Sequence, residues 1–304
     1  MSNPAIRFVK NKDIDYQKWD QCVARSSLPL IYSQSWYLDL ICPNWDALVS
    51  GDYMFIMPLI IKRKFGMSFL QQPIFAQQHG IFPETDNVTQ NNFLTIIRDQ
   101  FKYVNIHLNA SHTEPFPEGF AVYVRNNFIL NLSLSYPERK NIYSKYTCRQ
   151  IRKAEDNKVF IIKGMQSSEY FDLKVSSTKG KLLMSSMPTL KRLIEYGHSH
   201  ENGVIYAAYN EHNTLCAAAF FFFAGQRVIS MNAVSTAEGK NIHAMHKIVD
   251  QFIQEHSGLP LTLDFEGSMI PGVAGFNQGF GTETEQYYCL KSNRLPIPFR
   301  WLKK

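Results

Sequence analysis

The most apolar stretch of the chain, LCAAAFFFFA at 215–224, limits the folds open to it. Its length is about half of the roughly 20 residues that a helix needs to cross a bilayer. The run therefore predicts a buried β-strand, expected over 214–225. The flanking segments 203–209 (GVIYAAY) and 226–235 (QRVISMNAVS) also have strand character. The apolar run and the segment that follows it are joined at Gly225-Gln226. Three consecutive strands are expected, with the apolar run in the middle.

A helix and a further strand follow this meander. The helix is predicted from apolar residues spaced by three, four and seven positions, which mark one buried face. These residues are Ile242, Met245, Ile248, Val249, Phe252 and Ile253. Gly258 and Pro260 end the helix, and LTLDF at 261–265 is the predicted strand.

The first half of the chain repeats this order. Strands at 45–50, 53–61 and near 68–71 precede a helix at 88–103 and a strand at 104–109. Corresponding elements begin at 45 and 203, at 88 and 241, and at 104 and 261, so the offset stays between 153 and 158. A near-constant offset indicates two copies of one supersecondary unit.

Helical segments are predicted ahead of each meander. They lie at 16–24 and 33–41 in the first half, and at 137–156, 168–175 and 188–200 in the second. This order is typical of an α/β (mixed α+β) fold. We expect two tandem domains, 1–136 and 137–304, each a mostly antiparallel twisted sheet flanked by helices.

Composition excludes several kinds of protein. A net charge of +6 over 304 residues favours anionic partners but is too diffuse to indicate DNA binding. The five cysteines are scattered, with no C-x-x-C pair, so we expect no disulfide framework and no metal. His243 and His246 have no carboxylate partner in sequence and are interpreted as helix surface or core edge.

The start of the chain suggests where the protein resides. Met1-Ser2-Asn3-Pro4 lacks the basic segment and apolar run of a secretory signal. Together with the unpaired cysteines, this predicts a cytoplasmic location.

Two carboxylates close the second predicted domain. Asp264 and Glu266 lie two apart on one predicted strand and would share a face, just before Gly267 and Ser268. A partly desolvated carboxylate can serve as a general base. Alternatively, Asp264 caps the following turn while Glu266 is solvated.

A basic segment begins the second predicted domain. Arg149, Arg152 and Lys153 fall near one face of a predicted helix. Taken alone, such a stripe is usually a solvated surface.

The segment 261–281 closely resembles the closing segment of the Fem-type and related bacterial acyltransferases of the GNAT superfamily. The resemblance rests on Asp264-Phe265-Glu266-Gly267-Ser268 and on Gly279-Phe280-Gly281. The order of elements is also similar to that of a GNAT domain in both halves, so the resemblance covers almost the whole chain. It implies two tandem GNAT-like (acyl-CoA N-acyltransferase) domains.

The resemblance also implies where ligands bind. A GNAT domain holds the pyrophosphate of coenzyme A where a loop enters a helix, and here that position is Glu238, Gly239, Lys240 and Asn241. A plain polar helix start is the alternative. The segment with Arg149, Arg152 and Lys153 would face the cleft and hold an anionic substrate, together with Gly267 and Ser268. In the first domain, Gln78 would orient a substrate or satisfy loop backbone groups.

The implied function is N-acyltransfer. An acyl or aminoacyl group would move from acyl-CoA or another activated carrier to an amine of an anionic substrate of the envelope-precursor kind. Asp264 or Glu266 would be the base. An aminoacyl-tRNA donor is disfavoured because no long heptad segment is present.

A catalytically idle GNAT fold is the alternative function. Such a protein would bind a ligand or a membrane as an accessory in envelope polysaccharide synthesis. The absence of the family's usual Q/R-x-x-G-x-G/A phosphate loop favours it, and the Asp264–Ser268 segment opposes it. Peripheral membrane contact could use the arm 294–304, with Phe299 and Trp301, or this arm packs on its own domain.

Overall fold

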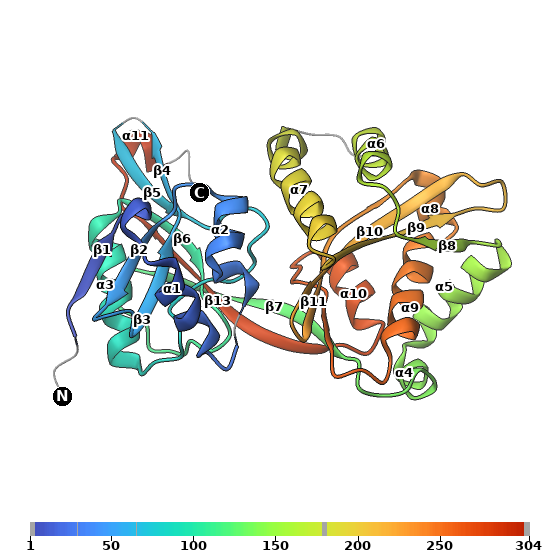
Figure 1. The fold of residues 1–304 in the computed structure, drawn as a ribbon, viewed down its shortest axis with the longest axis horizontal. Helices are drawn as coiled ribbons and strands as arrows, with labels where there is room; N and C mark the ends of the chain where they lie inside the picture. Colours follow the sequence, from blue (N-terminus) through green and yellow to red (C-terminus); the bar gives the residue numbers. More distant parts are fainter. Residues whose placement is uncertain (1–3, 29, 65, 178–180, 301–304) are drawn as a thin grey trace. The chain divides into compact units, whose positions relative to one another are not determined.

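The structure is a computed structural model that describes residues 4–28, 30–64, 66–177 and 181–300. It divides into two compact units, 1–125 with 286–304, and 126–285 (Figure 1). The chain leaves the first unit within β7 (Ala121–Asn131) and returns to it within β13 (Glu283–Asn293). The contiguous domains 1–136 and 137–304 stay a prediction, whereas the compact units assign 286–304 to the first unit.

Two sheets form the first unit. β1 (Ile6–Val9), β2 (Asp46–Ser50) and β3 (Phe55–Leu59) make an antiparallel sheet. The other sheet has the strand order β4 (Ile61–Lys64), β5 (Met67–Gln71), β6 (Tyr103–His107) and β13. In it, β5 and β6 run parallel. The 3-10 turns η1 (Asn11–Asp13) and η2 (Ile31–Ser33) and the helices α1 (Tyr16–Ala24), α2 (Ser35–Ile41), α3 (Asn87–Gln100) and α11 (Ile297–Arg300) complete the unit.

One sheet forms the second unit, in the order β7, β12 (Thr262–Asp264), β11 (Arg227–Ser235), β10 (Leu215–Ala224), β9 (Gly203–Tyr209), β8 (Phe160–Lys163). Neighbours are antiparallel except β11 and β12. The helices are α4 (Tyr136–Ile142), α5 (Lys145–Asp156), α6 (Ser167–Ser177), α7 (Lys181–Ser199), α8 (Ala237–Asn241), α9 (Ala244–His256) and α10 (Pro271–Gln278). α6 and α7 lie on one face of the sheet and α5 and α9 on the other (Figure 1).

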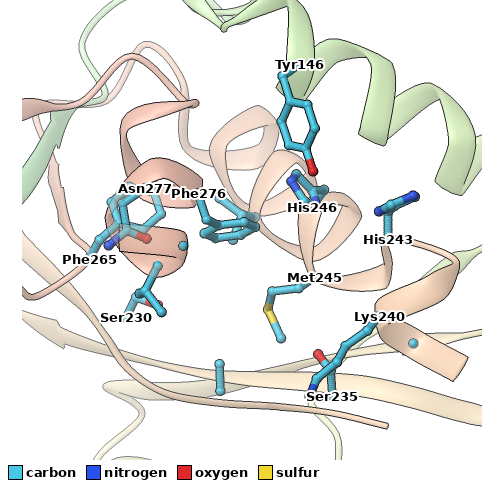
Figure 2. A pocket seen from close by; sticks show the side chains of 15 residues that line it. Tyr146, Ser230, Ser235, Lys240, His243, Met245, His246, Phe265, Phe276 and Asn277 are labelled. Atoms are coloured by element: carbon cyan, nitrogen blue, oxygen red, sulfur yellow. The ribbon is translucent and has the colours of Figure 1, made fainter. Parts of the chain in front are cut away.

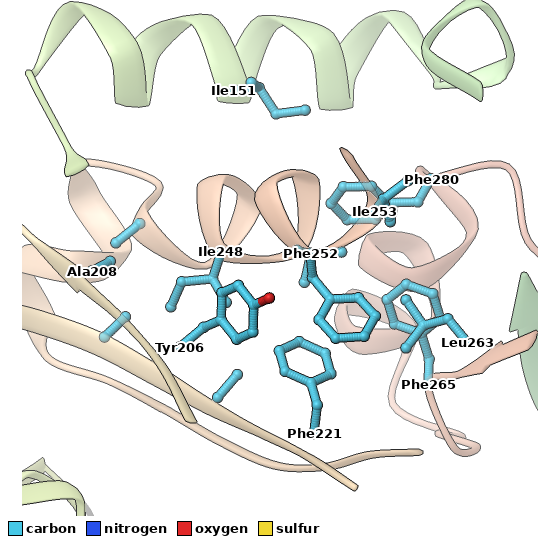
Figure 3. Close-up of a cluster of buried hydrophobic side chains, with 14 of the residues drawn as sticks. Ile151, Tyr206, Ala208, Phe221, Ile248, Phe252, Ile253, Leu263, Phe265 and Phe280 are labelled. Atoms are coloured by element: carbon cyan, nitrogen blue, oxygen red, sulfur yellow. The ribbon is translucent and has the colours of Figure 1, made fainter. Parts of the chain in front are cut away.

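The apolar run at 215–224 is strand β10, buried as predicted. Side chains alternate between the two faces of a strand. Phe221 stacks on Phe252 of α9, with ring centroids 4.0 Å apart (Figure 3). Phe220 and Phe222 face α7, where a Cβ on Gly197 would lie 3.1 Å from the Phe220 ring. Helices on both faces of the sheet therefore require an apolar strand here.

The predicted repeat appears as a parallel strand pair joined by a helix. β5, α3 and β6 form this arrangement in the first unit, and β11, α9 and β12 form it in the second. The predicted helix 137–156 is two helices, because Ser144 starts a new one by accepting a hydrogen bond from the Thr147 amide. Among the helices of the described ranges, none is long and apolar enough to cross a membrane.

Candidate functional site

A cavity of about 710 Å³ lies in the second unit (Figure 2). Its walls come from β11, α5, α8, α9, α10 and the residue that follows β12. The volume is within the range of small-molecule sites in proteins.

The cavity opens where two parallel strands separate. β11 and β12 pair only over Arg227–Ile229 and Thr262–Asp264. The next residue of each, Ser230 and Phe265, lines the cavity. Ligands of α/β sheets commonly bind at the carboxyl ends of parallel strands.

A β-bulge in β11 shapes one wall. Phe221 pairs with Ser230, but Phe220 pairs with Asn232, so Met231 is the extra residue. The bulge changes the alternation of side chains, and Ser230 and Ala233 both line the cavity although they are three residues apart.

Helix α6 holds the bulge from the other face of the sheet. The Tyr170 hydroxyl donates a hydrogen bond to Oδ1 of Asn232 at 2.7 Å. One turn later, the Lys174 ammonium donates to the Ala233 carbonyl at 2.9 Å. Lys174 is buried, and burial lowers its pKa. These two bonds fix the strand at the cavity wall.

Two histidines line the cavity at the start of α9. His243 precedes the helix with a left-handed backbone (φ 58°), and its ring lies 5.8 Å from that of His246. Burial, with a smaller effect of His243, lowers the pKa of His246 to about 4. Burial and the charge of Lys153 lower the pKa of His243. Both imidazoles are therefore neutral at pH 7, so each has one ring nitrogen without a proton.

The interior of the cavity is largely apolar. Met245, Val249, Phe265 and Phe276 contribute to it. The Phe276 ring lies 4.7 Å from the ring of His246, and Tyr146 of α5 points toward the same imidazole (Figure 2). Asn277 and Ser235 add polar groups.

One cation lines the cavity and others lie on helix α5. Lys240 is exposed and lines the cavity. The Arg149 guanidinium lies 5.5 Å from the centre of the Tyr146 ring, and the charge of Lys153 helps to lower the pKa of His243. Arg152 is exposed on the same helix. Among the described lining residues there is no carboxylate.

The predicted phosphate loop is the short helix α8. The amide of Gly239 donates to Oγ1 of Thr236 at 2.9 Å. A Cβ at Gly239 would lie 2.1 Å from the Cys216 carbonyl oxygen, so close packing on β10 requires glycine there. Glu238 accepts a hydrogen bond from Asn210 at 2.6 Å, and Asn241 is exposed at the helix end. Of the four residues, Gly239 and Lys240 line the cavity.

Asp264 is buried in an ion pair. Its Oδ2 lies 2.7 Å from Nε of Arg227, and its Oδ1 accepts the amide of Glu266 at 2.8 Å. Burial raises the pKa of Asp264, and the Arg227 charge opposes that rise. Arg227 also donates to Glu285 at 3.2 Å. Asp264 thus joins strands and does not line the cavity.

The expected sharing of one strand face by the two carboxylates is not observed. β12 ends at Asp264, and Glu266 is half-buried with a left-handed backbone (φ 56°). Gly267 is exposed, and Ser268 accepts the Ile270 amide at 3.1 Å in the turn before α10. Gln78 is buried in the first unit, where its Oε1 accepts the Ala110 amide at 2.9 Å, as the loop-support alternative expects.

The chain is similar in fold to several solved structures. FemX matches with a TM-score of 0.61 and 12% identity, covering 95% of this chain and 98% of that one. A conserved protein of unknown function from Bacteroides thetaiotaomicron matches with a TM-score of 0.59 and 13% identity, covering 94% of this chain and 99% of that one. The C-terminal domain of a putative lysylphosphatidylglycerol synthetase from Agrobacterium fabrum matches with a TM-score of 0.51 and 8% identity, covering 95% of this chain and 94% of that one.

The chain has a Fem-related GNAT fold. At these identities the likeness concerns the fold, in agreement with the resemblance drawn from residues 261–281. No protein-family model matches the sequence, and a comparison with curated proteins finds no similar sequence.

Several cavity residues of this GNAT fold were not predicted. From sequence, His243 and His246 are interpreted as helix surface or core edge, although they directly follow the expected phosphate loop; both line the cavity. Tyr146, Phe276 and Asn277 carry no such signal, because only tertiary packing brings α5 and α10 to the same cavity.

Proposed function

We propose that the protein is an N-acyltransferase that uses the cavity of the second unit. The observation that carries this proposal is the cavity at the separation of β11 and β12, with a bulged strand on one wall. Beyond Ile229, β11 has no strand partner on the β12 side within the described residues. Backbone groups at that edge are then not used by a neighbouring strand.

The lining supports a donor with a charged carrier and an apolar or small acyl group. Lys240, Arg149 and Lys153 supply positive charge around the cavity. Phosphate groups of acyl-CoA or of an aminoacyl carrier would satisfy these cations. The apolar interior suits the acyl group.

The reaction needs a proton acceptor. The amine attacks the acyl carbonyl carbon, a C–N bond forms, the bond from carbonyl to carrier breaks, and the ammonium proton leaves. The neutral imidazoles of His243 and His246 face the cavity, so we assign them this role ahead of Asp264, which Arg227 engages. Of the two carboxylates, Glu266 stays a candidate for the base, because it directly follows the lining residue Phe265.

Calorimetric titration with acetyl-CoA and a long-chain acyl-CoA tests the donor, with thiol release over a panel of amines as the readout of transfer. Lys240→Gln is expected to weaken donor binding about tenfold, through loss of a charge-assisted contact. Lys12→Gln, at an exposed lysine of the first unit, is the control. No binding of either donor, and no thiol release, would oppose a coenzyme A donor.

A catalytically idle binding protein is the second candidate. It is supported by the ion pair of Asp264 and by the Gly239 amide, which is already bonded to Thr236. Donor binding without transfer to any tested amine would favour it.

A further inference from the structure

Exposed apolar side chains gather beside the cavity. Met269, Ile270 and Val273 are exposed by 54%, 65% and 44% within five consecutive residues. Single exposed apolar residues are ordinary, but a contiguous group marks a contact surface. We call Met269, Ile270, Val273 and Tyr146 the apolar lip.

The lip is continuous with the cavity. Val273 and Tyr146 are exposed and also line the cavity, from α10 and α5 respectively. Phe276, one turn after Val273 on α10, reaches the interior beside His246 (Figure 2). An apolar path therefore runs from the surface into the cavity.

The cations lie around this lip. Arg149 stands over the Tyr146 ring at 5.5 Å, and Lys240 lines the same cavity. Lys153 lies one helical turn beyond Arg149 on α5, and its charge helps to lower the pKa of His243. Exposed apolar and aromatic side chains flanked by lysine and arginine are suited to the boundary between lipid headgroups and acyl chains.

We propose that the apolar lip docks the second unit on a bilayer surface that carries anionic phospholipid headgroups. Met269, Ile270 and Val273 enter the acyl boundary, while Arg149, Lys153 and Lys240 contact headgroup phosphates. The cavity then opens toward the membrane and takes an amphiphilic ligand from it. This docking surface does not depend on acyl transfer.

The two kinds of side chain have separable roles. The apolar group supplies contact area with the acyl boundary, and its effect does not depend on salt. The cations favour anionic over neutral lipid, and their effect weakens as salt is added. A cytosolic protein partner or a second copy of the chain would not require phospholipid.

Vesicle co-sedimentation of the full chain tests the proposal. Vesicles of phosphatidylcholine alone are compared with equal parts of phosphatidylcholine and phosphatidylglycerol. We expect binding to the anionic vesicles that falls with added salt. Ile270→Asp should reduce the partition coefficient about tenfold or more, because an isoleucine that enters the acyl boundary of the membrane is replaced by a charge.

Val88→Asp is the matched control, because Val88 of α3 is also 65% exposed. It should leave vesicle binding unchanged, and both variants should keep the far-ultraviolet spectrum and thermal midpoint of the parent protein. Lys153→Gln should reduce binding only to the anionic vesicles.

Three outcomes would overturn the proposal. One is no binding to anionic vesicles by the parent protein. A second is equal loss in Ile270→Asp and Val88→Asp. The third is loss in Ile297→Asp alone, which would place the contact on α11, where Ile297 is 74% exposed. Trp301 of that terminal arm lies outside the described residues. In the first of these cases, self-association that Ile270→Asp abolishes would identify a second copy of the chain as the partner instead.

Discussion

Nε of Arg227 lies 2.7 Å from Oδ2 of Asp264, and the Asp264 side chain is almost fully buried. Nη2 of the same guanidinium reaches Glu285 at 3.2 Å. One cation thus serves two carboxylates from two further strands. We interpret this cluster as a structural joint of the second unit, which leads to the first prediction.

Replacing Asp264 by alanine should lower the free energy of unfolding by about 3 kcal/mol, because the half-buried Arg227 guanidinium loses the closer of its two carboxylate partners. Urea denaturation measures this. Glu266→Gln, at a half-buried carboxylate outside the pair, should change stability by only about 0.5 kcal/mol. If Asp264→Asn kept full stability and abolished turnover, the carboxylate would have a chemical role instead.

Gly239→Ala should destabilise the second unit by on the order of 2–4 kcal/mol, because its Cβ would overlap the Cys216 carbonyl. Gly272→Ala is the control, since Gly272 also lines the cavity but has open space around it. The control should be neutral or slightly stabilising. Equal thermal midpoints of the two variants would argue against the packing role of Gly239.

His246→Gln should reduce kcat by about 10²-fold if the imidazole accepts the proton, with little effect on donor binding. Because burial holds the pKa of His246 near 4, the acid limb of the pH–rate profile should lie well below 6.5. Stopped assays over this range check both points. His212→Gln, at an exposed histidine, is the control. An acid limb at 6.5 would contradict the assignment.

The first unit should lose stability in acid. His112 is buried, its Nε2 accepts the Ile81 amide at 3.0 Å, and its Nδ1 contacts Gln90 at 2.9 Å. Burial lowers the pKa of His112 from 6.5 to about 4. Between these values the unfolded chain binds a proton that the folded chain does not. Stability therefore falls with falling pH, by up to about 3 kcal/mol in total.

Urea midpoints between pH 7 and pH 4 measure this loss. In His112→Gln the free energy of unfolding should depend less steeply on pH, because unfolding takes up about one proton fewer over this range. A parallel curve for the variant would assign the dependence to other groups, of which His79, buried with its pKa also lowered to about 4, is the first to test.

Lys174→Met should change stability little, because removing a buried ammonium offsets the loss of its hydrogen bond to the Ala233 carbonyl. Donor affinity should nevertheless fall several-fold, because the Ala233 carbonyl at the bulge loses its donor. Tyr170→Phe should lose about 1 kcal/mol of stability, through the unsatisfied Asn232 oxygen. Unchanged donor affinity in both variants would show that α6 does not hold the bulge for binding.

Strands with a clear local pattern could be predicted from sequence. β9 matches its expected range, and β10 and α9 differ only at their ends. β7 and β13 are not predicted from sequence because each has an exposed half and a largely buried half, so neither carries one period over its length. The exposed half is apolar in β7 (Ala121–Val124) and polar in β13 (Glu283–Gln286). Their partners also lie far away in sequence, as when Cys289 pairs with His107.

The candidate site was predictable only in part. Lys240 and Gly239 line the cavity, and Arg149 and Lys153 lie around it, because a helix start and a helix face are local features. The ion pair of Asp264 could not be predicted, because its partner Arg227 is 37 positions away in sequence, on another strand. Burial of that pair depends on the register between β11 and β12, which no local pattern determines.

The return of the chain to the first unit also bears on its synthesis. Leu290 of β13 is fully buried in the core around Phe93 and Ile97. The ribosome makes residues 126–285 before this strand, so the second unit has all its strands first. During translation, one side of β6 in the first unit therefore stays unpaired until β13 has been synthesised.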